Sequence, residues 1–389
     1  MTTPDGPAEG PFRELHQRMR ALPELPTTVP PTVPEQGNPS VTKATQPGTL
    51  PTATAAESTQ NNGGPATASV ENELGQQTYT EVTTPYLSPA TEQEMKIALW
   101  GATGSGKSTY LWTLPLAAEQ QSWTVIPLDE ASEEFKVRAE TSLMTEGRLP
   151  LPTADEVSIS WRLEKPPATT GPWWRRRQDP GCRILLTTIE RRGGDFEQLT
   201  ESVARQLLNA DGIVYLFDPE RELNPDSVDN VAFFVAAMAR LQRQTAGLNR
   251  LVDGRLPHHL AVCITKLDAI KVFAKAREGF WVSQASAWPF FPKVSPGDAQ
   301  LFFDWLCRTE LGDAASFVRD RIVANFLPRR VQYFVSSAIG FCLHKDRNFD
   351  LSDFGNLTSE GKRVRSMPRP INILEPLVAL NRSKRGLDD

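Results

Sequence analysis

The residues best suited to chemistry lie in one short stretch, Gly101-Ala-Thr-Gly-Ser-Gly-Lys-Ser108, which matches the pattern G-x-x-x-x-G-K-[ST]. Glycines at this spacing let backbone N–H groups turn inward around phosphate oxygens without a Cβ clash. Lys107 is placed to reach the β- and γ-phosphates, and the Ser108 hydroxyl to ligate Mg²⁺. The stretch therefore predicts a nucleoside triphosphate site with Mg²⁺, in which Lys107 is also catalytic. Its predicted nucleotide-binding residues are Gly101, Thr103, Gly104, Ser105, Gly106, Lys107, Ser108 and Thr109.

Two further stretches predict which base is bound. Thr265-Lys-Leu-Asp268 follows an apolar strand expected over 260–264. A carboxylate there can accept hydrogen bonds from N1–H and N2–H₂ of guanine, whereas adenine offers no such pair of donors. The stem of Lys266 would cover the base plane. Ser336-Ser-Ala-Ile-Gly340 follows the next expected strand, where the backbone N–H of Ala338 is placed to donate to guanine O6 and Ser337 to support the turn. The predicted base-binding residues are Thr265, Lys266, Asp268, Ser337 and Ala338.

Alternating strands and helices must position these loops. Strands are expected over 96–100, 157–163, 183–189, 213–217, 260–264 and 331–335, and helices over 107–119, 133–145, 228–245, 314–326 and 371–381. Such alternation predicts a mostly parallel sheet with helices on both faces. Right-handed crossovers then favour a three-layer, doubly wound α/β fold.

Composition separates the chain into two parts. Residues 1–92 are rich in Pro and Thr and are predicted to be a disordered extension, with a short amphipathic helix over 11–22. Residues 1–90 hold nine of the 47 acids and four of the 42 bases, so the remainder carries 38 of each sign. A neutral folded domain, predicted over 93–385, argues against strong nucleic-acid binding. No apolar run reaches membrane-span length and no signal peptide is visible, so a cytoplasmic protein with four reduced cysteines is expected.

The motifs together resemble the translation-factor-related (TRAFAC) class of P-loop GTPases, and within it the bacterial double-GTPase group. The stretches that carry the resemblance are 96–114, 210–218, 261–268, 335–340 and 369–380. The resemblance implies a nucleotide-switch fold, binding of GTP with Mg²⁺, and a role in bacterial signalling or conflict systems.

The chain departs from that family at the switches. The family places D-x-x-G after its third strand, where this chain has Glu190-Arg-Arg-Gly193. Glu190 is the expected acid toward Mg²⁺ and Gly193 the expected γ-phosphate sensor, with Asp195 as an alternative acid. Gly194 stands where a water-orienting Gln would follow, so slow intrinsic hydrolysis is expected.

The first switch needs a threonine that closes on Mg²⁺. Thr153 is best placed by its order in the chain, and Thr141 and Thr145 compete with it. The predicted metal ligands are therefore Ser108, Thr153 and Glu190.

Features outside these motifs suggest partner surfaces. Trp173, Trp174 and Arg175–Arg177 could stack bases or touch anionic lipid, but a solvated hairpin tip with partner-facing aromatics is the favoured interpretation. An aromatic insertion over 270–298 is a candidate partner or self-association surface. His258, His259 and His344 have no metal-ligand spacing.

Two other functional readings stay open. A remodelling ATPase of the AAA-like or motor type would use an acid at a strand end, for which Asp218 is the candidate. A nucleotide-bound scaffold would bind without hydrolysis. The sequence favours a GTP-dependent switch with a protein effector or activating partner.

Overall fold

The computed structural model describes residues 94–149, 157–170, 177–179, 181–190, 201–222, 229–344, 349–361 and 363–387. The predicted extension over residues 1–92 and its helix over 11–22 lie outside these residues.

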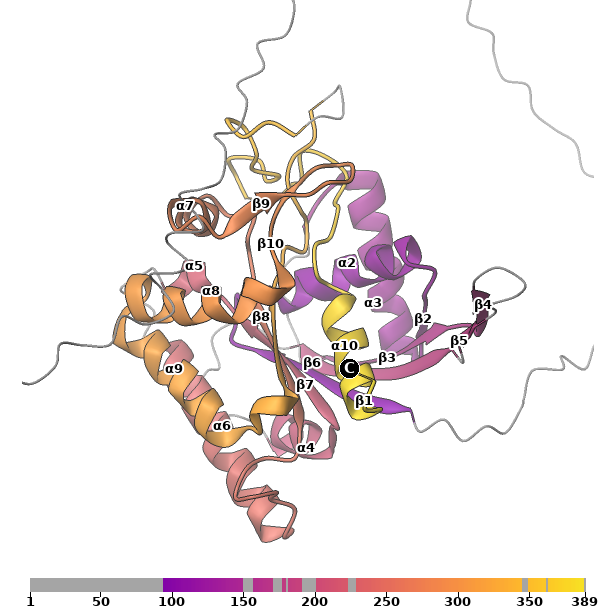
Figure 1. Ribbon diagram of the computed structural model, residues 1–389. Coiled ribbons are helices and arrows are strands. Elements are labelled where there is room, and N and C mark those ends of the chain that lie inside the picture. The colour runs from indigo at the N-terminus through magenta and orange to yellow at the C-terminus, as the bar shows by residue number, and fades with distance from the viewer. Residues whose placement is uncertain are drawn as a thin grey trace, which may run out of the picture. The chain divides into compact units, whose positions relative to one another are not determined.

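A seven-stranded sheet forms the centre of the molecule, with the strand order β11-β8-β7-β1-β6-β3-β2 (Figure 1). The strands from β11 to β6 run parallel to one another, whereas β3 is antiparallel to β6 and β2 is antiparallel to β3. The bounds are β1 Met95–Gly101, β2 Thr124–Pro127, β3 Val157–Lys165, β6 Cys182–Glu190, β7 Gly212–Phe217, β8 His259–Ile264 and β11 Val331–Val335. Two small hairpins are formed by β4 Ala168–Thr170 with β5 Arg177–Asp179, and by β9 Val282–Gln284 with β10 Pro292–Val294.

Helices cover both faces of the sheet (Figure 1). One face carries α2 Lys107–Gln120, α3 Glu130–Thr141 and α10 Glu375–Lys384. The other carries α4 Glu201–Asn209, α6 Asp229–Gly247, α8 Ala299–Trp305 and α9 Gly312–Asn325. The short helix α5 Pro219–Glu222 follows β7, and α7 Ile270–Glu278 follows β8.

The central strand shows why two helical layers are needed. Met95, Ile97 and Leu99 join the buried cluster formed with α2 and α10. Trp100 points to the other face and stacks on Phe234 of α6 with ring centroids 5.5 Å apart. Since both sets of side chains are apolar, β1 is stable only when both faces are covered.

The predicted three-layer, doubly wound α/β fold is confirmed. A strand, a glycine loop and a helix open the described domain, as in P-loop nucleotide-binding domains of the small-GTPase-like type. Among the described helices, none combines the length and apolarity required to cross a membrane.

Local differences have physical causes. The strand β2 and helices α4 and α8 were not predicted. Segments as short as β2, with four residues, and α8, with seven, give little signal, whereas α4 is clearly amphipathic and its helical pattern was missed. The closing helix was expected from residue 371 but begins at Glu375, since Ile371 forms a bridge with Ser337. The helix expected over 133–145 begins at Glu130, capped by Asp129, and ends at Thr141 in a π-helical turn over Ser142–Glu146.

Candidate nucleotide-binding site

The phosphate loop joins β1 to α2, and its glycines adopt the backbone geometry that the motif requires. Gly104 has φ of +80° and Gly106 of +96°, a region that favours glycine. Gly106 is the N-cap of α2 and supplies no side-chain cap to the first-turn N–H groups. An anion therefore fits the start of α2, where orphan donors and the positive end of the helix dipole coincide.

Close packing holds the loop against the sheet. A Cβ on Gly101 would lie 3.0 Å from the Leu216 carbonyl oxygen and 2.5 Å from the Ser105 Oγ. The Ser105 side chain is buried, and its backbone N–H donates to the Ala102 carbonyl at 3.1 Å. Ser105 therefore shapes the turn.

Lys107 folds back over the loop that precedes it. Its Nζ donates to the carbonyl oxygens of Gly101, at 2.9 Å, and Ala102, at 3.3 Å. Charged phosphate oxygens are stronger acceptors than neutral carbonyls. The Lys107 ammonium therefore lies beside the loop that would hold the phosphates, and a bound phosphate would attract it away from these carbonyl oxygens.

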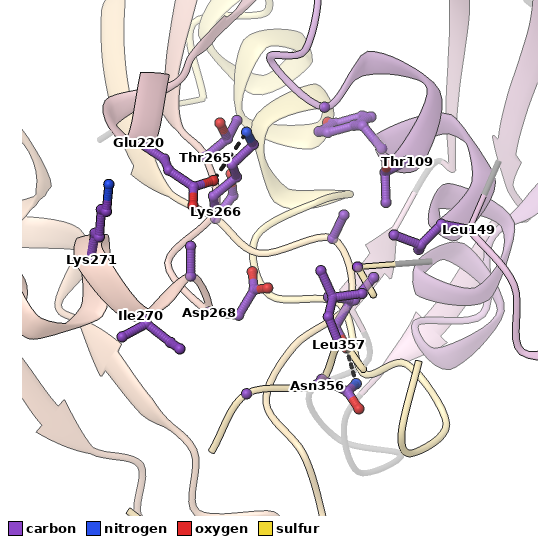
Figure 2. A pocket seen from close by; sticks show the side chains of 18 of the residues that line it. Thr109, Leu149, Glu220, Thr265, Lys266, Asp268, Ile270, Lys271, Asn356 and Leu357 are labelled. Carbon is purple, nitrogen blue, oxygen red and sulfur yellow. Dashed lines mark hydrogen bonds and ion pairs between the residues drawn. The ribbon is translucent and has the colours of Figure 1, made fainter. Parts of the chain in front are cut away.

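The two base-side loops meet because β8 and β11 are parallel neighbours that end at the same level, with Val335 paired to Ile264. The Leu267 N–H donates to the Ser336 carbonyl at 3.1 Å, and the Ser337 hydroxyl donates to the Asp268 carboxylate. Figure 2 shows the Asp268 carboxylate in the pocket between Lys266 and Leu357. Sequence motifs 69 residues apart, at Asp268 and Ser337, are brought into direct contact.

Asp268 lies in surroundings that disfavour its charge. Burial raises the pKa of its carboxyl to about 6, although the Ser337 hydrogen bond and the Lys266 charge work in the opposite direction. A carboxylate held in this way gains from two further N–H donors, which is what guanine offers.

Lys266 is fixed by two acids. Its Nζ lies 2.7 Å from Asp218 Oδ2 and 3.3 Å from Glu220 Oε2, and its backbone has φ of +60°. Burial opposes the charge, but the Asp218 carboxylate raises the pKa of Lys266. The ammonium is thereby held by Asp218 and Glu220, and Lys266 lines the cavity together with Glu220.

The remaining predicted base-side residues differ in their roles. Thr265 is buried and bonds through N–H, at 2.8 Å, and hydroxyl, at 3.0 Å, to the Phe217 carbonyl, so it holds the loop to β7. Ala338 lines the pocket, and within the described residues its N–H has no paired acceptor. Gly340 has φ of +65°, and a Cβ there would lie 2.2 Å from the Arg369 carbonyl oxygen.

Both ends of the site open into one cavity of about 640 Å³, a size typical of small-molecule sites. Ser105, Gly106 and Thr109 line its phosphate end, and Lys266 and Asp268 line its base end.

The rest of the cavity wall was not predicted. It includes Leu149 and the loop over 355–361, in which the buried Asn356 amide donates to the Ile339 carbonyl at 3.0 Å. Val364 donates to the Gly147 carbonyl at 2.7 Å, which ties this loop to the segment that carries Leu149. Neither segment contains a motif, so only the tertiary structure reveals them.

The predicted switch residues follow the phosphate loop in the sequence, and most of them lie outside the described residues. Thr153, Gly193 and Asp195 are among those not described. Glu190 ends β6, whose parallel register with β1 runs from Met95↔Ile184 to Ala98↔Thr187. Continued to the ends of both strands, this register places Glu190 opposite Gly101, so their backbones lie at the same level of the sheet. The role of Glu190 toward Mg²⁺, together with Ser108 in the first turn of α2, stays a prediction.

Mg²⁺ is typically held by few protein groups together with phosphate oxygens and water. Within the described part of the chain, no group of three or more His, Cys, Asp or Glu side chains could hold a metal. The Ser108 hydroxyl, in the first turn of α2, is a ligand type that suits an ion of this kind.

Asp218 and Thr145, the alternative candidates for the metal site, already have hydrogen-bond partners elsewhere. Asp218 Oδ1 accepts from the backbone N–H groups of Glu220, at 3.1 Å, and Arg221, at 3.3 Å, while Oδ2 pairs with Lys266. The carboxylate is thus occupied as a structural acceptor, which weakens the ATPase reading that needs it at a metal. Thr145 donates to the Thr141 carbonyl within the π-helical turn.

The other features noted in the sequence have simple environments where they are described. The insertion over 270–298 forms α7 and the β9–β10 hairpin, and its Phe291 packs edge-on against Phe341. Trp173 and Trp174 lie outside the described residues. His258 is buried, and burial lowers its pKa to about 4.

Nucleotide affinity is expected to fall in acid because of Asp268. Only the ionised carboxylate accepts both guanine N–H groups, and with a pKa of about 6 it is mostly protonated at pH 5. Lowering the pH from 7 to 5 should weaken GDP binding roughly tenfold, as a titration with a fluorescent GDP analogue would measure. A flat profile between these values would contradict the assignment.

The raised pKa of Asp268 has the opposite effect on folding, because it increases stability as the pH falls. A raised carboxyl pKa means that the folded protein without nucleotide holds a proton that the unfolded chain releases. This contribution to stability is full below about pH 4 and is lost as the pH rises through about 6. Weaker binding at pH 5 therefore cannot be attributed to this group unfolding the protein.

The chain matches no protein-family model, and no curated protein matches it. Among solved structures, a chain of the signal recognition particle receptor SRb-GTP/SRX complex from Chaetomium thermophilum is 15% identical with a TM-score of 0.34, covering 64% of this chain and 92% of that one. The S. cerevisiae Ski7 GTPase-like domain bound to GTP is 14% identical with a TM-score of 0.30, covering 65% and 45%. Sup35 complexed with GDP is 16% identical with a TM-score of 0.27, covering 67% and 41%. The present chain thus spans less than half of the Ski7 and sup35 chains.

Proposed function

We propose that this protein binds GTP with Mg²⁺ and hydrolyses it slowly, acting as a nucleotide-controlled switch. The observation that carries the proposal is the single cavity lined at one end by the phosphate loop and at the other by Lys266, Asp268 and Ala338. A phosphate cradle with a half-buried carboxylate across the same pocket matches guanosine di- or triphosphate in the chemistry of both ends.

Each end does a different task. The N-terminus of α2 and Lys107 bind the phosphates, while Asp268, held by Ser337, selects guanine by accepting its N–H edge. Mg²⁺, when bound, supplies positive charge to the β- and γ-phosphates. Ser108, Thr153 and Glu190 are proposed to hold it.

The switch is proposed to lie in the segments that contain Thr153 and Gly193. Contacts to the γ-phosphate would order such segments, and loss of that phosphate would release them. Since Gly194 stands where a water-orienting glutamine would follow, turnover is expected to be slow without a partner. Purified protein that hydrolyses tens of GTP per second alone would contradict this.

The resemblance to bacterial double-GTPases extends the proposal to a role in bacterial signalling or conflict systems with a protein effector. Its test is recovery of an interacting protein whose affinity differs between the GTP- and GDP-loaded states. An effector that binds both states equally would argue for a scaffold in place of a switch.

Nucleotide competition tests the proposal directly. Unlabelled GTP should displace a fluorescent GDP analogue at concentrations at least about 10³-fold lower than ATP, because adenine leaves the Asp268 carboxylate without its two donors. Guanosine alone should compete weakly, since it lacks the phosphates. Equal displacement by GTP and ATP would favour the ATPase reading, and tight GTP binding without any hydrolysis would favour the scaffold.

A further inference from the structure

Arg221 lies against the phosphate loop, although nothing in the motifs marks it. It belongs to α5, which directly follows β7, a strand that neighbours β1 in the sheet. Its guanidinium donates to the Thr103 carbonyl, and a Cβ on Gly104 would lie 3.2 Å from its Nη1. A residue 118 positions away in sequence therefore reaches the middle of the loop.

Two cations sit on consecutive carbonyls of this loop. Lys107 Nζ occupies the carbonyl oxygens of Gly101 and Ala102, and Arg221 occupies that of Thr103. The motif explains Lys107 as the phosphate-binding lysine. Arg221 contacts the carbonyl of the next residue, so both cations lie beside the phosphate cradle, where charged phosphate oxygens are stronger acceptors than these neutral carbonyls.

The backbone of Arg221 is fixed from the base end of the site. Asp218 Oδ1 accepts from the N–H groups of Glu220 and Arg221, which anchors α5 to the end of β7. Asp218 Oδ2 pairs with Lys266 Nζ at 2.7 Å. The arginine is thus positioned through one carboxylate that also positions the base-motif lysine, which favours a built feature of the site over a chance surface contact.

GTP hydrolysis is accelerated by positive charge placed where negative charge develops in the transition state. A water oxygen bonds to the γ-phosphorus, and the bond from that phosphorus to the β–γ bridging oxygen breaks. Its electron pair stays on GDP, and a water proton leaves with the phosphate. Charge builds on the bridging and γ-oxygens, where an arginine is especially effective because its planar guanidinium binds two oxygens.

We propose that Arg221 is a catalytic residue supplied by this chain itself, which moves from the Thr103 carbonyl to the γ-phosphate oxygens and stabilises the transition state of GTP hydrolysis. The proposal rests on the proposed GTPase function. Arg221 then stabilises the negative charge of the transition state, and a different group orients the attacking water.

Three variants test this. Arg221→Gln keeps a donor for the Thr103 carbonyl but removes the charge, Arg221→Lys keeps the charge but removes the planar fork, and Arg138→Ala removes an exposed arginine on α3. Each is compared with the full-length wild type for GDP affinity, for single-turnover GTP hydrolysis with Mg²⁺, and for trapping of GDP with aluminium fluoride.

For Arg221→Gln, GDP affinity should stay near the wild-type value while hydrolysis falls on the order of 10³-fold and the fluoride complex is lost. Arg221→Lys should fall between the two, and Arg138→Ala should match the wild type. Thermal melting checks that each variant folds, and should Arg221→Gln unfold, Arg221→Lys decides by the same readouts.

The outcomes separate the two proposals. If Arg221→Gln hydrolyses and traps like the wild type, or weakens GDP binding as much as it slows hydrolysis, Arg221 merely shapes the loop and the inference is overturned. A wild-type protein that binds GTP but neither hydrolyses it nor forms the fluoride complex overturns the GTPase function as well.

Discussion

Replacing Lys107 with alanine is expected to weaken GTP and GDP binding by about 10- to 150-fold and to abolish measurable hydrolysis. A charge-assisted hydrogen bond of this kind contributes about 1.5–3 kcal/mol to binding, which corresponds to that range of affinity. The effect on hydrolysis is larger, because negative charge on the transferred phosphoryl group increases in the transition state. Titration with a fluorescent GDP analogue and single-turnover hydrolysis measure the two effects separately.

A matched control is Lys136→Ala, which removes a lysine on α3 whose Nζ lies 3.7 Å from Glu140. It should bind and hydrolyse GTP as the wild type does. If Lys107→Ala retains full GDP affinity, the glycine loop does not hold phosphates in the way proposed here. The free protein should stay folded, since the hydrogen bonds from Lys107 to Gly101 and Ala102 join residues of one loop and do not hold helices or strands together.

The sequence was most informative where local chemistry dictates structure. The glycine loop, the apolar strands 213–217 and 260–264 and the base-side loops all follow from residue types within a few positions of one another. Parallel strand order then brings Thr265 and Ser336 to one edge of the sheet, because both follow strands in register. These parts of the fold and site need no distant partner to be recognised.

What the sequence did not reveal depends on contacts between distant segments. Leu149 and the loop over 355–361 line the pocket because Asn356 of that loop bonds to Ile339 and Val364, which follows the loop, bonds to Gly147. The sequence did not mark Arg221 as a site residue, because only the folded structure shows that its guanidinium contacts the Thr103 carbonyl. The start of α10 shifted for the same reason, because Ile371 pairs with the base-side loop before the helix begins.

These long-range contacts connect the two ends of the site. Thr103 contacts Arg221, the backbone of Arg221 is held by Asp218, and Asp218 pairs with Lys266 beside the base. Burial raises the pKa of Asp218, and the Lys266 charge counteracts that rise. The ion pair with Lys266 therefore opposes protonation of a carboxylate on which both the base-side loop and the phosphate-side arginine depend.

Replacing Asp268 with asparagine is expected to exchange the preferred base from guanine to xanthine. Asparagine offers one acceptor and one donor, which match N1–H and O2 of xanthine but oppose the N2–H₂ group of guanine. Since each altered hydrogen bond is worth about 1.5–3 kcal/mol, the ratio of GTP to XTP affinity should shift on the order of 10³-fold toward XTP. Competition of GTP and XTP against a fluorescent nucleotide measures this ratio.

Loss of GTP binding in Asp268→Asn would not reflect unfolding. Burial raises the pKa of Asp268, so a neutral amide removes an unfavourable buried charge, and the melting temperature at pH 7.5 should equal or exceed that of the wild type. The Ser337 hydroxyl can still donate to the amide oxygen, which orients the amide nitrogen for the ligand. Asp253→Asn, at an exposed turn with φ of +51° that asparagine tolerates, is the matched control and should keep its preference for GTP. If Asp268→Asn keeps its preference for GTP, or gains ATP in place of XTP, then Asp268 does not contact the base and the guanine assignment is wrong.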